Sequence, residues 1–118
     1  NTFDPQRRIK SLGEIYAGYA DAHRDSGKHL WANLEIWQMD GPKYGNSYPP
    51  TFERVLEQLG AEKNHVDVIT TYTVLGFMER PESTVALGGK RAIELFEAYK
   101  KYYDATAERL GLSQPLQE

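Results

Sequence analysis

Glu35 is the residue whose type and position most favour chemistry. It lies between Asn33 and Trp37 in the segment HLWANLEIWQ, residues 29–38, and alternate side chains of an extended segment point to the same side. A carboxylate near the carboxyl end of a strand is placed where catalytic groups of α/β barrels lie. Glycosidic bond cleavage uses two such carboxylates, about 5 to 5.5 Å apart for retention and about 6.5 to 9.5 Å apart for inversion. The structural alternative is that Glu35 only neutralises a nearby arginine or lysine.

Aromatic and amide side chains near Glu35 are suited to a ligand rich in hydroxyl groups. Trp31 and Trp37 are expected on the Glu35 side of the strand, and Trp37, nearer its end, could stack on a sugar ring. Tyr72, late in a second predicted strand, could bond a ligand or orient Glu35, or could equally be a core ring. The loop after the first strand adds Gln38, Asp40, Lys43, Tyr44, Asn46 and Tyr48. The candidate substrate-binding residues are Asn33, Trp37, Gln38, Tyr44 and Tyr72.

Other kinds of site are not expected. The chain has no cysteine, which excludes disulfides and thiolate chemistry. Its histidines, His23, His29 and His65, are too scattered for a metal cluster, so we expect neither a metal nor a cofactor. The run Gly88-Gly89-Lys90 lacks the spacing of a phosphate-binding loop and is interpreted as a helix start. Glu79-Arg80 is interpreted as a surface charge pair.

The composition of the chain limits the classes of partner that we expect. The 118 residues are 40% hydrophobic and 26% charged, with a net charge of −3 and no long run of either sign. This balance argues against nucleic acid as a partner. The sequence also contains no apolar run of the length that spans a bilayer, so no membrane contact is expected. Because the chain begins with Asn1 rather than Met, we expect it to be processed or cut from a longer one.

The elements that position these residues alternate between helix and strand. Apolar residues at three- and four-residue spacing predict helices over 4–26, 52–60 and 90–110. Strands are predicted over 29–38 and 66–75, and the first has an aliphatic face, Leu30, Ala32, Leu34 and Ile36, opposite Glu35. Loops are predicted over 39–50 and 76–89. A strand, a helix and another strand predict two parallel strands joined by a right-handed crossover.

The predicted α-β-α-β-α arrangement has too few strands for a complete parallel sheet. Parallel sheets need cover on both faces and neighbours at their edges. An eight-stranded barrel takes roughly 250 residues, so the predicted fold class is α/β, a segment of a (β/α)8 TIM barrel. We expect residues 1–111 to form this segment and 112–118 a loose tail. The remainder of the barrel, from the same gene, another chain or another copy, is then an expected partner.

Four segments carry a resemblance to a known family. LWANLEIWQ, YPPTFERVLEQLG, VDVITTYTVLGFM and AIELFEAYKKYY resemble, in this order, the C-terminal part of an uncharacterised bacterial domain of unknown function in the TIM-barrel glycosidase superfamily. The similarity covers most of residues 28–104. The matching positions are Trp31, Ala32, Asn33, Glu35, Trp37, Arg54, Gln58, Val66, Asp67, Ile69, Tyr72, Gly76 and Met78.

The resemblance implies a C-terminal barrel segment whose two strands are the seventh and eighth. It also implies a carbohydrate ligand and an exported, periplasmic or extracellular, protein. Many retaining glycosidases of this superfamily have a nucleophilic Glu at the end of strand seven, which Glu35 matches. Their general acid lies on strand four, outside this chain. Val74 departs from the pattern, because that position is often aromatic.

Three hypotheses follow. The first is a glycoside-hydrolase-like barrel in which Glu35 is the nucleophile or an electrostatic stabiliser, with the isolated chain inactive for lack of the second carboxylate. The second is a non-catalytic carbohydrate-binding barrel. The third is a small self-associating α/β module with a structural role.

Overall fold

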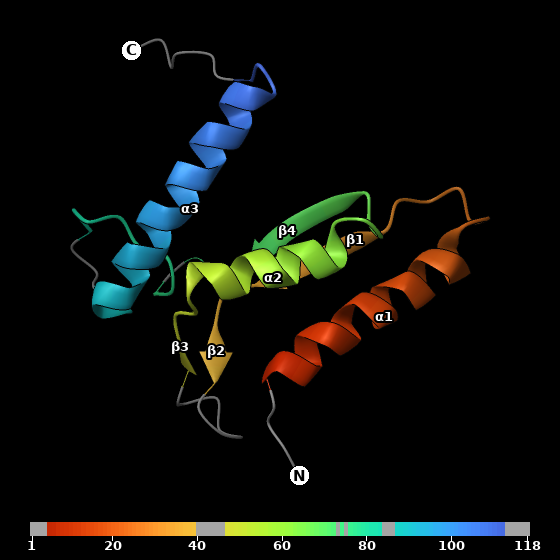
Figure 1. The fold of residues 1–118 in the computed structure, drawn as a ribbon, viewed down its shortest axis with the longest axis horizontal. Helices are drawn as coiled ribbons and strands as arrows, with labels where there is room; N and C mark the ends of the chain where they lie inside the picture. Colours follow the sequence, from red (N-terminus) through yellow and green to blue (C-terminus); the bar gives the residue numbers. More distant parts are fainter. Residues whose placement is uncertain (1–4, 40–46, 73, 75, 84–86, 113–118) are drawn as a thin grey trace.

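The computed structural model describes residues 5–39, 47–72, 74, 76–83 and 87–112. In chain order the elements are α1 (Pro5–His23), β1 (Trp31–Glu35), β2 (Gln38–Met39), β3 (Ser47–Tyr48), α2 (Phe52–Glu62), β4 (Val68–Tyr72) and α3 (Gly89–Arg109) (Figure 1). The predicted mixed α/β class, with three helices alternating with two main strands, is confirmed. Within the described ranges no helix has the length and apolar character needed to cross a bilayer.

β1 and β4 form the parallel pair that the sequence predicts. Their register joins Trp31 to Val68 at one end and Glu35 to Tyr72 at the other. Ile36 N donates to Tyr72 O at 2.8 Å, which extends the ladder past the last residue of β1. The strands are shorter than the predicted 29–38 and 66–75, because pairing holds only five residues of each.

The segment predicted as a loop over 39–50 contains a small antiparallel ladder. β2 pairs with β3, Gln38 opposite Tyr48 and Met39 opposite Ser47. The loop prediction is wrong at Met39, Ser47 and Tyr48, because a ladder of two residue pairs is too short to produce an alternating sequence pattern. Tyr44 lies in residues 40–46, outside the described residues.

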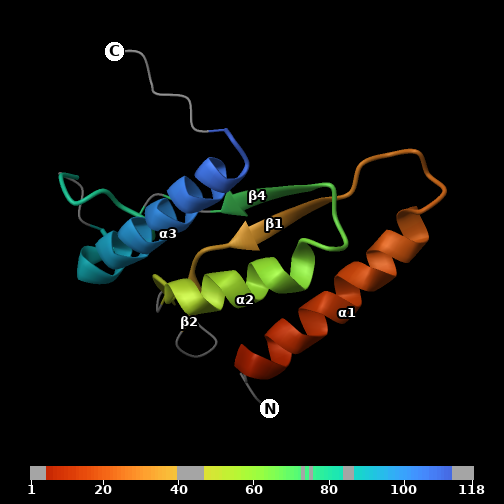
Figure 2. The same ribbon diagram turned by 45° about the horizontal axis from the view of Figure 1, so that its top comes forward.

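The helices pack on the aliphatic side of the parallel pair. The core consists of Leu34, Ile36, Val55, Met78 and Leu95, surrounded by Phe52, Leu59, Ile69, Phe96 and Tyr99. Ala32, Leu34 and Ile36 are at most 2% exposed, which confirms the predicted aliphatic face of the first strand. In both views α2 lies between α1 and α3 (Figure 1, Figure 2).

A close approach of glycine backbones fixes the start of α3. A Cβ on Gly88 would lie 2.6 Å from Ala92 Cβ and would overlap the backbone of Gly76. Gly89 follows with φ of 59°, a conformation that costs glycine little. α3 begins at Gly89, which confirms the interpretation of Gly88-Gly89-Lys90 as a helix start.

The interpretation of Glu79-Arg80 as a surface charge pair is wrong, because Glu79 is buried. Its side chain is 6% exposed, and its Oε1 accepts a hydrogen bond of 3.3 Å from Leu87 N. Its backbone N donates to Ala92 O at 3.1 Å. Glu79 therefore holds the segment after β4 against the start of α3, while Arg80 is exposed.

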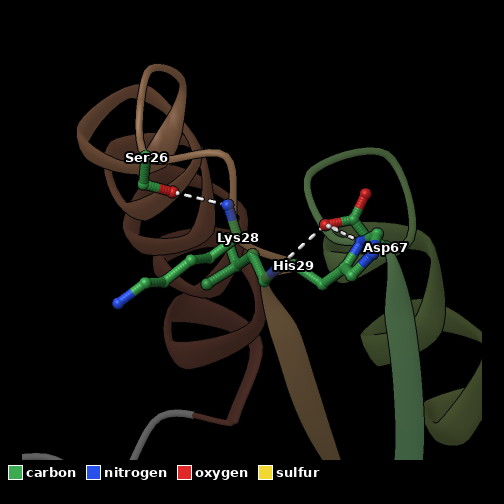
Figure 3. A network of polar contacts seen from close by, with 5 residues as sticks. Ser26, Lys28, His29 and Asp67 are labelled. Carbon is green, nitrogen blue, oxygen red and sulfur yellow. Dashed lines mark hydrogen bonds and ion pairs between the residues drawn. The ribbon is translucent and has the colours of Figure 1, made fainter.

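Asp67 connects the beginnings of the two parallel strands (Figure 3). Its Oδ2 accepts a 2.8 Å hydrogen bond from Leu30 N, and its backbone N donates to Leu30 O at 2.9 Å. The same Oδ2 lies 3.6 Å from His29 Nδ1. Both the backbone N–H and the C=O of Leu30 therefore bond to Asp67. This contact fixes the register of the parallel pair at the residues just before β1 and β4.

Substitution of Asp67 tests this contact. Asp67→Ala should lower the free energy of unfolding by about 1 to 2 kcal/mol, because Leu30 N loses its acceptor. Asp67→Asn keeps an acceptor oxygen and should lose less. Urea unfolding followed by circular dichroism measures both. Equal stability of wild type and the alanine variant would contradict the assignment.

Candidate functional site

The side of the β1–β4 pair that faces away from the helices carries the candidate site. Residues paired in register on parallel strands project to the same face, so this face holds Trp31, Asn33 and Glu35 beside Val68, Thr70 and Tyr72. All six are exposed. Trp31 is 62% and Tyr72 58% exposed. We call these six residues the Glu35 face.

The register brings Glu35 and Tyr72 together, because they are partners at the carboxyl ends of the two strands. One pair earlier, Thr70 Oγ1 lies 3.5 Å from Asn33 Oδ1 and 3.3 Å from Ala32 O. Thr70 therefore orients the Asn33 side chain. A carboxylate, a phenol hydroxyl and an amide on one face can together bind hydroxyl groups of a ligand.

Two other candidate residues, Trp37 and Gln38, lie outside this face. β1 ends at Glu35, and Trp37 follows two residues later as a half-buried side chain outside the strand. Gln38 belongs to β2 and lines a separate cavity. Of the predicted site residues within the described ranges, the structure places Asn33, Glu35 and Tyr72 on one face.

The cavity that Gln38 lines has a volume of about 560 Å³. It lies between β2, β3 and the beginnings of α2 and α3, and its lining residues are Gln38, Tyr48, Pro49, Pro50, Thr51, Phe52, Glu53, Arg91, Glu94, Leu95 and Ala98. The Arg91 guanidinium carbon lies 5.2 Å from the centre of the Tyr48 ring. Tyr48 is among the loop residues noted in the sequence, whereas Arg91 was not predicted, since a cation on an exposed helical position carries no distinctive signal.

Glu62 is a second acidic residue near the candidate site that sequence analysis missed. It is 2% exposed, and its Oε2 has no hydrogen-bond partner among the described residues. Burial, and then the charge of Glu35, raises the pKa of Glu62 to about 7. The available sequence signal was the spacing of Val55, Gln58 and Glu62, which places the acid on the buried stripe of α2.

Tyr16 of α1 shares the surroundings of Glu62. Burial raises the pKa of the Tyr16 hydroxyl most, and the charge of Glu62 raises it further. A hydrogen bond from the backbone of Asn33 acts in the opposite direction. Glu62 and Tyr16 thus lie within electrostatic reach of the Glu35 strand. Glu62 itself lies on the buried stripe of α2 and is not one of the six residues of the Glu35 face.

No cluster of three or more histidine and acidic side chains able to hold a metal ion occurs within the described ranges.

Comparisons with known proteins give structural likenesses but no sequence family. No protein-family model matches the sequence, and no curated protein matches it. A crystal structure of a "putative alpha-L-fucosidase" from Bacteroides thetaiotaomicron is similar to this chain, with a TM-score of 0.64 and 23% sequence identity. The match covers 81% of this chain and 28% of the other. The α/β fold described above is therefore shared with part of a larger protein.

The buried acid predicts a pH-dependent stability. The folded protein holds the Glu62 proton up to a pKa of about 7, against 4.5 for an ordinary glutamate. The free energy of unfolding should therefore fall by about 3 kcal/mol as pH rises from 4.5 to above 7, because ionisation favours the unfolded chain. Glu62→Gln should abolish this fall.

Chemical denaturation across this pH range measures the effect. Glu57→Gln, on an exposed position of the same helix, is the matched control and should retain the wild-type pH dependence. If wild type and Glu62→Gln lose stability in parallel, Glu62 does not carry the proton.

Proposed function

We propose that the chain is part of a glycoside-hydrolase-like (β/α)8 barrel that acts on a carbohydrate, with Glu35 as its nucleophile or electrostatic stabiliser. The observation that carries this proposal is the position of Glu35, exposed at the carboxyl end of β1 and in register with Tyr72. Active sites of such barrels are built at the carboxyl ends of the parallel strands.

The likeness to the Bacteroides thetaiotaomicron structure supports the class of activity. That protein is a "putative alpha-L-fucosidase", and this chain matches 28% of its length. Under the proposal, the Glu35 face lines the inside of the barrel, and the remaining strands come from residues outside this chain. A carbohydrate is the ligand that follows from this comparison and from the hydroxyl-binding groups beside Glu35.

In the proposed reaction the Glu35 carboxylate oxygen attacks the anomeric carbon of the sugar. The bond from that carbon to the leaving oxygen breaks, and an acid on another strand protonates the leaving group. Water then hydrolyses the glycosyl–Glu35 ester. In the alternative role, the Glu35 charge stabilises the oxocarbenium-like transition state without forming a bond.

The neighbours of Glu35 take supporting roles. The Tyr72 hydroxyl, from the partner position on β4, donates to the Glu35 carboxylate or to the sugar. Asn33, which Thr70 orients, contacts sugar hydroxyls. Substrate-binding roles for Trp37, Gln38 and Tyr44 stay predictions from the sequence.

The proposal takes the second carboxylate from outside this chain. Of the six residues on the Glu35 face, only Glu35 is acidic. The 118-residue chain alone should therefore show no glycosidase activity on aryl glycosides. Detectable turnover by the purified chain would contradict a shared active site.

Glu35→Gln in the complete protein is the direct test of the catalytic role. It should lower kcat by several orders of magnitude while leaving sugar affinity nearly unchanged, because the amide keeps the shape but cannot attack or carry charge. Tyr72→Phe should lower kcat about tenfold, because one hydrogen bond to a charged group is lost. Glu57→Gln, on an exposed position of α2, should have no effect.

Steady-state kinetics on an aryl glycoside and calorimetric titration with the free sugar separate turnover from binding. Unchanged kcat in Glu35→Gln would overturn the catalytic role. A complete protein that binds sugar without any turnover would favour the non-catalytic carbohydrate-binding barrel instead.

A further inference from the structure

The cavity beside β2 and β3 is separate from the Glu35 face. Its lining residues include neither Glu35 nor Tyr72. The volume of about 560 Å³ is within the range of about 300 to 1,000 Å³ that is usual for small-molecule sites. Figures 1 and 2 both place the beginnings of α2 and α3 at the end of the molecule where β2 lies.

The cavity combines an apolar wall with polar groups. Pro50 and Leu95 are buried and Phe52 is half-buried, so one side offers carbon surface. Phe52 is itself held by Tyr99, whose ring centre lies 6.5 Å away in an edge-to-face contact. Such a surface can cover the C–H face of a ring, as aromatic side chains do for partly apolar ligands.

The polar groups of the cavity supply both donors and acceptors. Arg91 donates only, Glu94 accepts only, and the Gln38 amide does both. Arg91 is held over the Tyr48 ring, and Glu94 Oε1 lies 3.3 Å from Lys90 Nζ. These contacts orient the two charged side chains before any ligand arrives.

The charges of the lining argue against an anion as the ligand. The beginnings of two helices and Arg91 attract negative charge. Glu53, in the same lining, offsets the charge of Arg91, and Glu94 is paired with Lys90, so the cavity carries little net charge. A neutral ring with several hydroxyl groups satisfies acidic and basic groups together.

We propose that this cavity binds a neutral, polyhydroxylated ring such as a monosaccharide, at a site distinct from the Glu35 face. Arg91 and Gln38 donate to its hydroxyl oxygens, Glu94 accepts from its hydroxyl groups, and Phe52 contacts its carbon face. This binding requires no activity of Glu35.

Titration of the protein followed by amide NMR tests the site. L-fucose and D-galactose are the sugar probes, and inorganic phosphate is the anionic probe. A sugar should shift the amide signals of Tyr48, Phe52 and Arg91, while phosphate should not. Arg91→Ala, at an exposed helical position, should weaken that sugar affinity about tenfold, as expected for lost hydrogen bonds to a charged group.

Two further variants serve as controls for the effect of Arg91→Ala. Lys101→Ala removes a cation from an exposed position later in α3 and should leave the affinity unchanged. Glu35→Gln should also leave the cavity shifts unchanged, so failure of the Glu35 proposal is distinguishable from failure of this one. Sugar shifts confined to Asn33 and Tyr72, no sugar shifts, or shifts of the cavity signals by phosphate alone would each overturn the proposal.

Discussion

The parallel pairing of β1 with β4 is the interaction on which the rest of the structure depends. It buries Leu34 and Ile36 against Val55 and Leu95 of the helices, and Asp67 sets its first position by bonding both backbone groups of Leu30. A slip of one residue would exchange the two faces of a strand. The Glu35 carboxylate would then point into the apolar core, where an isolated charge is strongly destabilising.

The two faces of this pair differ in how they are covered. On the helical side Ala32 and Leu34 are 2% exposed. On the other side Trp31 and Tyr72 have more than half of their surface exposed, and parallel sheets are usually covered on both faces. This exposed aromatic face is the reason for proposing that further strands enclose it and complete a ligand site around Glu35.

The main elements could be predicted because their patterns are local. Alternation along 30–36 identified both faces of β1, and the order of elements required a parallel crossover. The antiparallel contact of Gln38 with Tyr48 joins positions ten residues apart without any local pattern, so it was missed. The burial of Glu79 depends on its contacts with Leu87 and Ala92 at the start of α3, and the burial of Glu62 depends on tertiary packing, which no local pattern encodes. The Glu35–Tyr72 pairing also needed the register, which neither strand shows alone.

A crystal structure of the complete protein with a bound sugar inhibitor tests the central claim most directly. The account predicts that β1 and β4 are neighbouring strands of a closed barrel, with the Glu35 carboxylate about 3 Å from the anomeric carbon of the sugar. A structure in which Glu35 points away from the bound sugar, or in which no further strands cover its face, would contradict it.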